Sequence, residues 1–163
     1  MALTINAELP AARQFAPAAD RRGVLEKYPA RPTVRGVTDG TSNTVLFAEC
    51  AGREDVYRGR TVKPAAADKA DPNCARARGG GWATNDNPYE IGGRFEWCSG
   101  AATVPGLMKI NNSNEWGHLY YSFHDGGANA AMADGGVRFL SAATDLYTLA
   151  VMATRAGGEV SPE

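Results

Sequence analysis

The clearest pattern of apolar and polar residues lies in the last third of the chain. Residues 128–133 (Ala-Asn-Ala-Ala-Met-Ala) form a run small and apolar enough for a tightly packed strand. Asp134-Gly135-Gly136 follows and supplies the positive-φ positions that a tight reversal needs. Val137 and Phe139 then fall on one face of a second strand. The pattern therefore predicts a β-hairpin, with Gly135 as a structural turn residue.

A helix is predicted directly after this hairpin. Thr144 or Asp145 can cap its start, and Gly157-Gly158 is expected to end it. Four apolar residues recur at helical spacing on one face: Leu146, Leu149, Ala150 and Ala153.

A second ordered region ends at residue 50. Residues 38–43 (Thr-Asp-Gly-Thr-Ser-Asn) are rich in side chains that bond their own backbone, so we expect Asp39, Gly40 and Asn43 to be structural turn residues. The apolar run 44–48 follows and is bounded by Glu49. It predicts a buried strand, although its short length also fits a helix.

These elements indicate an α+β fold in a single domain over residues 1–163, a length that suits one modest core. The 19 glycines favour turns and short strands over a helical bundle. We divide the chain into an N-terminal arm (1–30), a turn and strand (31–50), an insertion of loops and short strands (51–117) and a hairpin plus helix (120–158).

Charge and hydropathy exclude two classes of partner. The net charge is −1, with the two signs interleaved, so the sequence carries no footprint for nucleic acid or an anionic membrane. No apolar run approaches the roughly 20 residues that a membrane-spanning helix needs. The start of the sequence also lacks the basic and apolar regions of a signal peptide.

The cysteines have no zinc-finger spacing. Cys74 and Cys98 lie in a region rich in Gly, Asn and Pro, and we expect a disulfide between them if the compartment is oxidising. Cys50 ends an apolar run and is interpreted as a buried thiol, although its pairing with either other cysteine stays open.

Two separated motifs carry a family resemblance. The segment 36–44 (Gly-Val-Thr-Asp-Gly-Thr-Ser-Asn-Thr) leads into the apolar run that ends at Glu49, and His124 is followed by nine residues and then Asp134-Gly135. In this order and spacing, the chain resembles bacterial exported proteins with a prepilin-type leader and a C-terminal H-X9-DG domain. The resemblance covers residues 31–50 and 120–160 and hardly touches the segment between them.

This resemblance implies a pilin-like or pseudopilin-like architecture, with an antiparallel sheet, long loops and a short C-terminal helix. It also implies an extracellular or cell-surface location and other pilin-like subunits as partners. Such proteins carry a leader and a long apolar helix that this sequence lacks, so we expect a truncated chain or a fragment freed from its anchor. A calcium site is implied by analogy with pseudopilins.

The residues themselves suggest one metal site and one simpler alternative. The candidate ligands are His124, Asp125, Asp134 and Glu49, which fit calcium or a transition metal. A straight seven-residue strand spans roughly 23 Å, so His124 and Asp134 cannot touch unless the chain folds back. In the alternative, both side chains bond backbone groups of neighbouring turns, and this is the favoured interpretation.

The sequence offers candidates for two other functions, ester or amide hydrolysis and binding through aromatic rings. Ser122 lies beside His124, but in Tyr-Ser-Phe-His rather than in the Gly-x-Ser-x-Gly elbow of a serine hydrolase. Flat aromatic rings suit either a glycan or partner surface or the core. The aromatic candidates for a binding surface are Trp82, Trp97, Trp116, Tyr120 and Tyr121.

The leading hypothesis is a non-enzymatic, extracytoplasmic pilin-like domain that takes part in surface assembly or secretion. Its partners would be other pilin-like subunits or surface glycans. The competing hypothesis is a secreted metal-dependent hydrolase or a carbohydrate-binding module on the same scaffold.

Overall fold

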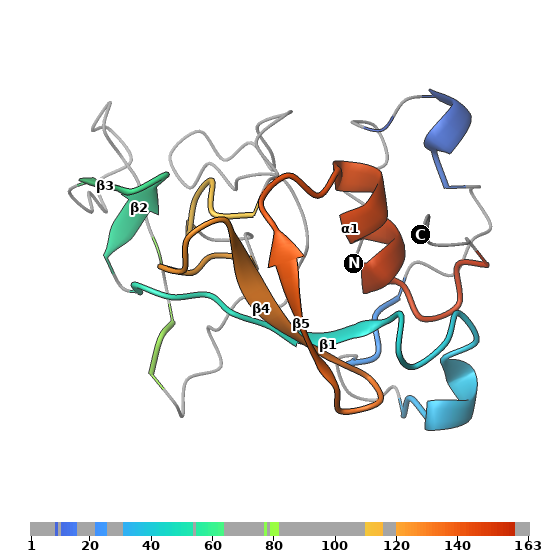
Figure 1. Cartoon of the computed structure of the whole chain (residues 1–163). Helices are drawn as coiled ribbons and strands as arrows, with labels where there is room; N and C mark the ends of the chain where they lie inside the picture. The colour runs from blue at the N-terminus through green and yellow to red at the C-terminus, as the bar shows by residue number, and fades with distance from the viewer. Residues whose placement is uncertain are drawn as a thin grey trace, which may run out of the picture.

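The computed structural model describes residues 9, 11–15, 22–25, 31–53, 55–63, 77, 79–81, 110–115 and 120–158. It has antiparallel sheets and a short C-terminal helix, which confirms the predicted α+β class (Figure 1). The three-stranded sheet has the order β1-β4-β5. Its strands are β1 (Val45–Ala48), β4 (Gly127–Met132) and β5 (Val137–Ser141). The other elements are the hairpin of β2 (Val56–Arg58) with β3 (Thr61–Lys63), the helix α1 (Leu146–Ala153), and 3-10 turns at Ala11–Arg13 and Val34–Gly36.

The predicted β-hairpin is confirmed as β4 and β5. The two strands pair antiparallel, with Ala128 opposite Leu140 and Ala131 opposite Val137. At the turn, Gly135 has φ of +88°, and Gly136 N donates to Asp134 Oδ1 over 2.8 Å. The turn therefore forms for the reason the sequence suggested: a glycine takes the left-handed conformation, and an aspartate accepts a backbone N–H.

The apolar run before Glu49 is a strand, as predicted, and not a helix, but it is a half-buried edge strand rather than a buried one. β1 pairs antiparallel with β4, and an irregularity between Val45 and Phe47 shifts the register. Val45 and Ala48 pack against the core, whereas Phe47 is 58% exposed on the other face. The bulge thus directs one large apolar side chain away from the interior.

The helix begins as predicted but ends earlier than expected. Asp145 caps it, accepting hydrogen bonds from Tyr147 N and Thr148 N. The helix ends at Ala153, before Gly157-Gly158, and Thr154 takes an extended conformation with φ −85° and ψ 148°. The chain leaves the helix here because Arg155 N donates to Arg22 O over 3.0 Å, outside the helix.

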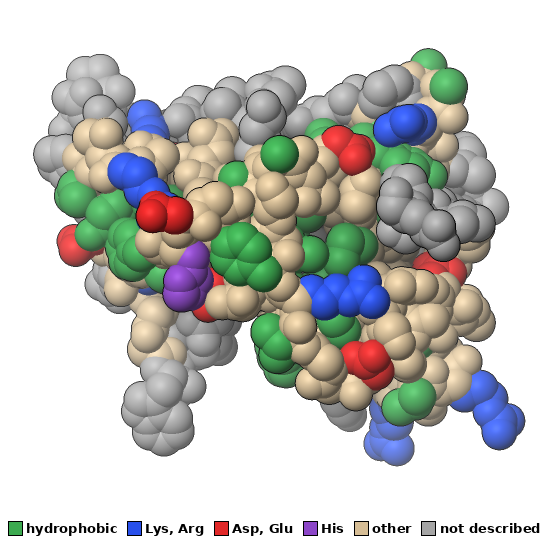
Figure 2. Space-filling model, in the orientation of Figure 1, with side chains coloured by type: hydrophobic (Ala, Val, Ile, Leu, Met, Phe, Trp, Pro, Cys, Tyr) green, Lys and Arg blue, Asp and Glu red, His purple; other side chains and the backbone are tan. Residues whose placement is uncertain are grey.

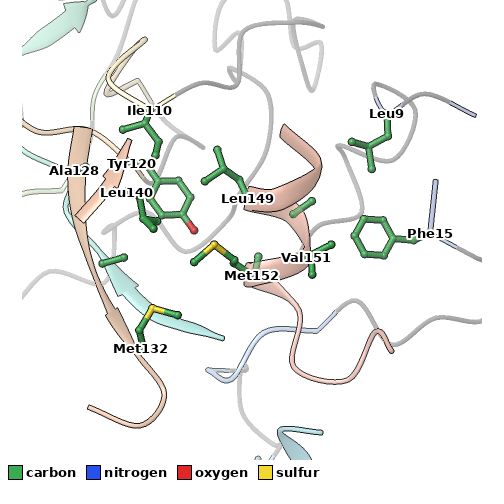
Figure 3. Close-up of a cluster of buried hydrophobic side chains, with 13 residues drawn as sticks. Leu9, Phe15, Ile110, Tyr120, Ala128, Met132, Leu140, Leu149, Val151 and Met152 are labelled. Atoms are coloured by element: carbon green, nitrogen blue, oxygen red, sulfur yellow. The ribbon is translucent and has the colours of Figure 1, made fainter. Parts of the chain in front are cut away.

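The core lies between α1 and one face of the three-stranded sheet. Leu149 and Met152 of α1 face Met132 and Leu140 of the sheet, as Figure 3 shows. The small side chains of Ala128 and Ala130 on β4 are buried in the same cluster. Leu9 and Phe15 of the N-terminal arm are also buried in this cluster.

No helix in the described part of the chain is both long and apolar enough to cross a lipid bilayer.

The approach of β5 to β4 leaves no room for a side chain at Gly127. A Cβ there would collide with the Leu140 carbonyl oxygen and would lie 2.7 Å from the Phe139 ring. We predict that Gly127→Ala lowers the free energy of unfolding by about 1–3 kcal/mol, as overpacking does. Denaturant unfolding measures the change. Gly36→Ala is the matched control, because its nearest neighbour would lie 3.7 Å away. Equal stabilities of the two variants would contradict the prediction.

Candidate functional site

The H-X9-DG residues mark the two ends of β4. His124 precedes the strand and Asp134 follows it, so the nine intervening residues contain the whole of β4. Because β1 runs antiparallel to β4, the turn before β1 lies beside Asp134, and Glu49 after β1 lies beside His124. The two motifs of the sequence therefore meet at both ends of one strand pair.

At the start of β4, Glu49 contacts Asn129 and His124; we call this the first end contact of the β1–β4 pair. Glu49 Oε2 accepts from Asn129 N over 2.7 Å, and Glu49 Oε1 accepts from Asn129 Nδ2 over 3.0 Å. His124 Nε2 lies 3.4 Å from the same Oε1 atom. The backbone adds a bond of 3.1 Å from Glu49 N to Asn129 O, so this contact extends the β1–β4 ladder through a side chain.

These neighbours lower the pKa of Glu49 below its ordinary value of 4.5. Partial burial acts alone in the opposite direction and is the largest single influence on this pKa. The hydrogen bonds from Asn129, together with the nearby His124 ring, outweigh that burial. Glu49 is therefore held as a carboxylate by its contacts.

The second end contact joins Asp134 to the turn that precedes β1. Hydrogen bonds from the Gly136 backbone and from the Ser42 side chain lower the pKa of Asp134. Nearby, Ala133 N donates to Thr44 O over 2.8 Å. Asp134 therefore both shapes its own turn and joins the hairpin to the 38–43 turn.

Asp39 reaches beyond its own turn to the segment that follows α1. Its carboxylate accepts from Gly157 N over 2.8 Å and from Gly158 N over 3.1 Å, while its backbone N–H donates to Arg155 O. Gly40, at φ +97°, forms the turn itself, where its carbonyl oxygen accepts from Asn43 N. The 38–43 turn is thus bonded both to the β4–β5 hairpin and to residues 155–158, which follow α1.

The four candidate metal ligands do not converge. His124 and Glu49 are in contact, but the exposed Asp125 lies 3.6 Å from Arg60, and Asp134 is at the far end of β4. No group of three or more His, Cys, Asp or Glu side chains in the described ranges could hold a metal ion. Calcium takes six to eight oxygen ligands, and these residues do not assemble such a set.

Ser122 is committed to a structural role. Its buried hydroxyl donates to Gly127 O over 2.6 Å and accepts from His124 N over 3.1 Å. The His124 ring points instead toward Glu49 and packs edge-on against Phe139, with ring centroids 6.4 Å apart. Ser122 and His124 therefore lack the hydroxyl-to-imidazole contact of a hydrolytic pair.

Two residues of the predicted aromatic surface belong to the interior instead. Tyr120 and Tyr121 are both buried, and Tyr121 Oη donates to Gly59 O over 2.6 Å. Tyr120 Oη has no hydrogen-bond partner among the described residues, and burial raises the pKa of its hydroxyl. The remaining candidates, Trp82, Trp97 and Trp116, lie outside the described residues.

Cys74 and Cys98 also lie outside the described residues, so the predicted disulfide stays a prediction. Cys50 is a partly buried thiol that accepts a hydrogen bond of 3.1 Å from Arg53 Nε. Burial raises the pKa of this thiol, although Arg53 acts against the rise.

The sequence reasoning missed two asparagines that position the His124 loop and the β2–β3 hairpin. Asn111, at φ +63°, accepts from Ser122 N through Oδ1 and donates to Gly127 O through Nδ2. Asn114 is buried and bonds to the backbone of Ala51, Asp55 and Tyr57. The polar run 111–114 (Asn-Asn-Ser-Asn) was the available signal, because such side chains frequently bond backbone groups.

The sheet exposes an apolar face on the side away from α1. We call this the outer face and define it by Phe47, Val137 and Phe139, which are 58%, 70% and 53% exposed. Phe47 and Val137 both lie opposite Ala131, and Phe139 lies opposite Asn129, so all three point to the same side. Figure 2 shows the histidine (purple) beside exposed hydrophobic side chains (green), and His124 is the neighbour of Phe139.

These features define an α+β protein whose three-stranded sheet is fixed by side-chain contacts at both ends of β1 and β4 and is apolar on its outer face. The family model for a protein of unknown function, DUF1559, matches residues 4–147, and the chain belongs to that family. Neither the curated proteins nor the solved structures contain a significant match to the chain.

The Glu49 contact predicts a dependence of stability on acid. The folded-state pKa of Glu49 lies below the ordinary value of 4.5, so its stabilising effect is complete above that pH. The effect is lost as the pH falls through the folded-state pKa. We predict that Glu49→Gln flattens the fall in unfolding free energy below pH 4.5, because the variant has no carboxylate to protonate. Urea unfolding between pH 3 and 7 measures the two slopes, and equal slopes would refute the prediction.

The Asp39 contact predicts a loss of stability and of amide protection in the segment that follows α1. Asp39→Ala removes a carboxylate that accepts two backbone N–H bonds, so we expect a loss of about 1.5–3 kcal/mol in unfolding free energy. Amide exchange at Gly157 and Gly158 should become faster at the same time. Asp125→Ala is the control, because the Asp125 side chain is fully exposed. Unchanged exchange at both glycines in Asp39→Ala would contradict the prediction.

Proposed function

We propose that this chain is an extracytoplasmic pilin-like or pseudopilin-like domain that docks onto other subunits in surface assembly or secretion, and that it is not an enzyme. The observation that carries the proposal is the outer face. Three large apolar side chains are more than half exposed there, on a short sheet whose other face is already covered by α1. Contiguous exposed apolar surface on a folded domain marks an interaction site.

The two motifs support the proposal through what they hold in place. The end contacts of Glu49 and Asp134 fix β1 against β4, and Gly127 allows Phe139 to lie over β4. The polar residues of the motifs are therefore used to display an apolar surface on a rigid sheet. A docking domain requires such a surface, and no reacting group is needed.

The family resemblance supports the location that we propose. The H-X9-DG spacing and the 36–44 motif resemble exported proteins, which supports a location outside the cytoplasm and pilin-like subunits as partners. The alternative of a metal-dependent hydrolase or a carbohydrate-binding module has less support. The Ser122 hydroxyl donates its hydrogen bond to a backbone carbonyl oxygen, and the four candidate metal ligands do not lie together.

The proposal predicts that charge on the outer face releases the protein from its assembly. In source cells, we expect the wild-type chain in a high-mass envelope fraction and the Phe47→Lys/Val137→Lys variant as free chain. Both changed side chains are mostly exposed, so thermal unfolding should show that the variant remains folded. Fractionation followed by native electrophoresis measures the distribution.

Val34→Lys is the matched control, because Val34 is 75% exposed but lies in the 3-10 turn Val34–Gly36 and not on the sheet. It should assemble like the wild type. Recovery of the wild-type chain from the cytoplasm would overturn the proposed location. Normal assembly of the double variant would overturn the role of the outer face.

A further inference from the structure

We propose that two copies of this chain pair antiparallel through strand β5, so that their sheets join into one. The inference rests on the proposed function, because it names one subunit onto which the domain docks: a second copy of the chain, bound at the β5 edge beside the outer face. It is carried by the direction of the backbone groups in β5, by the composition of this edge and by the register that its one charge permits.

The backbone of β5 has one side bonded to β4, and no residue that the structure describes forms a strand on its other side. At one end of this ladder, Met132 N donates to Gly136 O over 2.8 Å; at the other end, Ala142 N donates to Gly126 O over 2.7 Å. Hydrogen-bonded pairs alternate along an antiparallel ladder, and at both ends the bonded residue on the β5 side has an even number. The even-numbered residues of β5 therefore bond to β4, and the odd-numbered ones direct their N–H and C=O groups to the opposite edge.

This edge lacks the features that usually prevent strand pairing. Natural edge strands are protected by prolines, by charges, or by bulges. β5 reads Val-Arg-Phe-Leu-Ser, without proline and with one charge, and Val137 and Phe139 remain mostly exposed. Among the residues that the structure describes, none forms a strand against this edge.

The charge of Arg138 and the length of β5 together select the register. A shift that pairs Phe139 with Ser141 would place Val137 opposite Ala143, beyond the end of the strand. With a twofold axis at Phe139, the two Phe139 residues face each other, Val137 faces Ser141 of the second copy, and Arg138 faces Leu140. A shift that pairs Val137 with Phe139 would place Arg138 opposite Arg138, and like charges directly opposite destabilise a sheet. The Phe139-centred register avoids that repulsion and uses the free backbone groups of residues 137, 139 and 141.

The same register joins the two outer faces. A twofold axis perpendicular to the sheet places the outer faces of the two copies on the same side. Phe47, Val137 and Phe139 of both copies therefore lie on one side of a continuous sheet. The helix α1 packs on the opposite face of each sheet and does not obstruct the β5 edge (Figure 1). Ser141 O already accepts from Thr144 N over 2.9 Å, but a carbonyl oxygen has a second lone pair for the new bond.

Cysteine crosslinking of the purified full chain tests this register. In Val137→Cys/Ser141→Cys, the introduced thiols face each other in hydrogen-bonded pairs whose Cα atoms lie about 5.5 Å apart. That separation suits a disulfide. In either single variant, the two copies' thiols are four residues apart along the strand, about 13 Å, which is too far. We expect at least about tenfold more covalent dimer from the double variant, a ratio equivalent to 1.4 kcal/mol.

The wild-type chain is oxidised in parallel as a control for crosslinks through the native cysteines. Sedimentation equilibrium of the wild-type chain measures dimer formation without any substitution. A wild-type chain that stays monomeric up to about 1 mM would overturn the inference. A wild-type dimer without preferential crosslinking of the double variant would overturn the β5 register. Normal envelope assembly that depends on the outer face, together with a monomeric purified chain, would refute only this inference. A crosslinked dimer from a chain found in the cytoplasm would refute only the proposed function.

Discussion

The pairing of β1 with β4 is the interaction on which the rest of this structure depends. β1 supplies one edge of the sheet, and the turn before it holds both the hairpin and the segment after α1. Each end of the pair is closed by a carboxylate, Glu49 at one end and Asp134 at the other. If the strands separated, the exposed outer face and the α1-covered core would both lose their common support.

A carboxylate suits this position better than a neutral side chain would. Bonds that a charged acceptor makes to backbone N–H groups are shorter and roughly twice as strong as neutral ones. Glu49 uses both of its oxygens on Asn129 and still meets His124. The Glu49 side chain therefore fixes the backbone and the side chain of Asn129, and it also contacts the histidine that precedes β4. In this structure the polar residues of the two motifs form bonds that hold the sheet together.

Local structure could be predicted from the sequence because its causes are local. The glycine at 135 and the cap at Asp145 act within a few residues, and both behave as predicted. The partners of Glu49 and Asp39 could not be predicted, since they lie 80 and 118 residues away and leave no mark on local periodicity. Tyr120 and Tyr121 show the same limit. A pair of tyrosines reads equally well as surface or core until the 110–115 segment is seen to bond beside them.

The contacts that define the frame enclose a long stretch of chain. Glu49 and Asn129 are bonded across 80 residues, so everything between the two motifs is a loop closed on the same pair of strands. The entropy of closing a loop grows only with the logarithm of its length, and a doubling adds roughly 0.6 kcal/mol. By this cost alone, a change in the number of residues between 63 and 110 adds little to the free energy of folding. The residues around 110–115 and 120–121 are different, because burial and hydrogen bonds tie them to the sheet. The frame on which the sheet depends therefore includes parts of the chain far from both motifs.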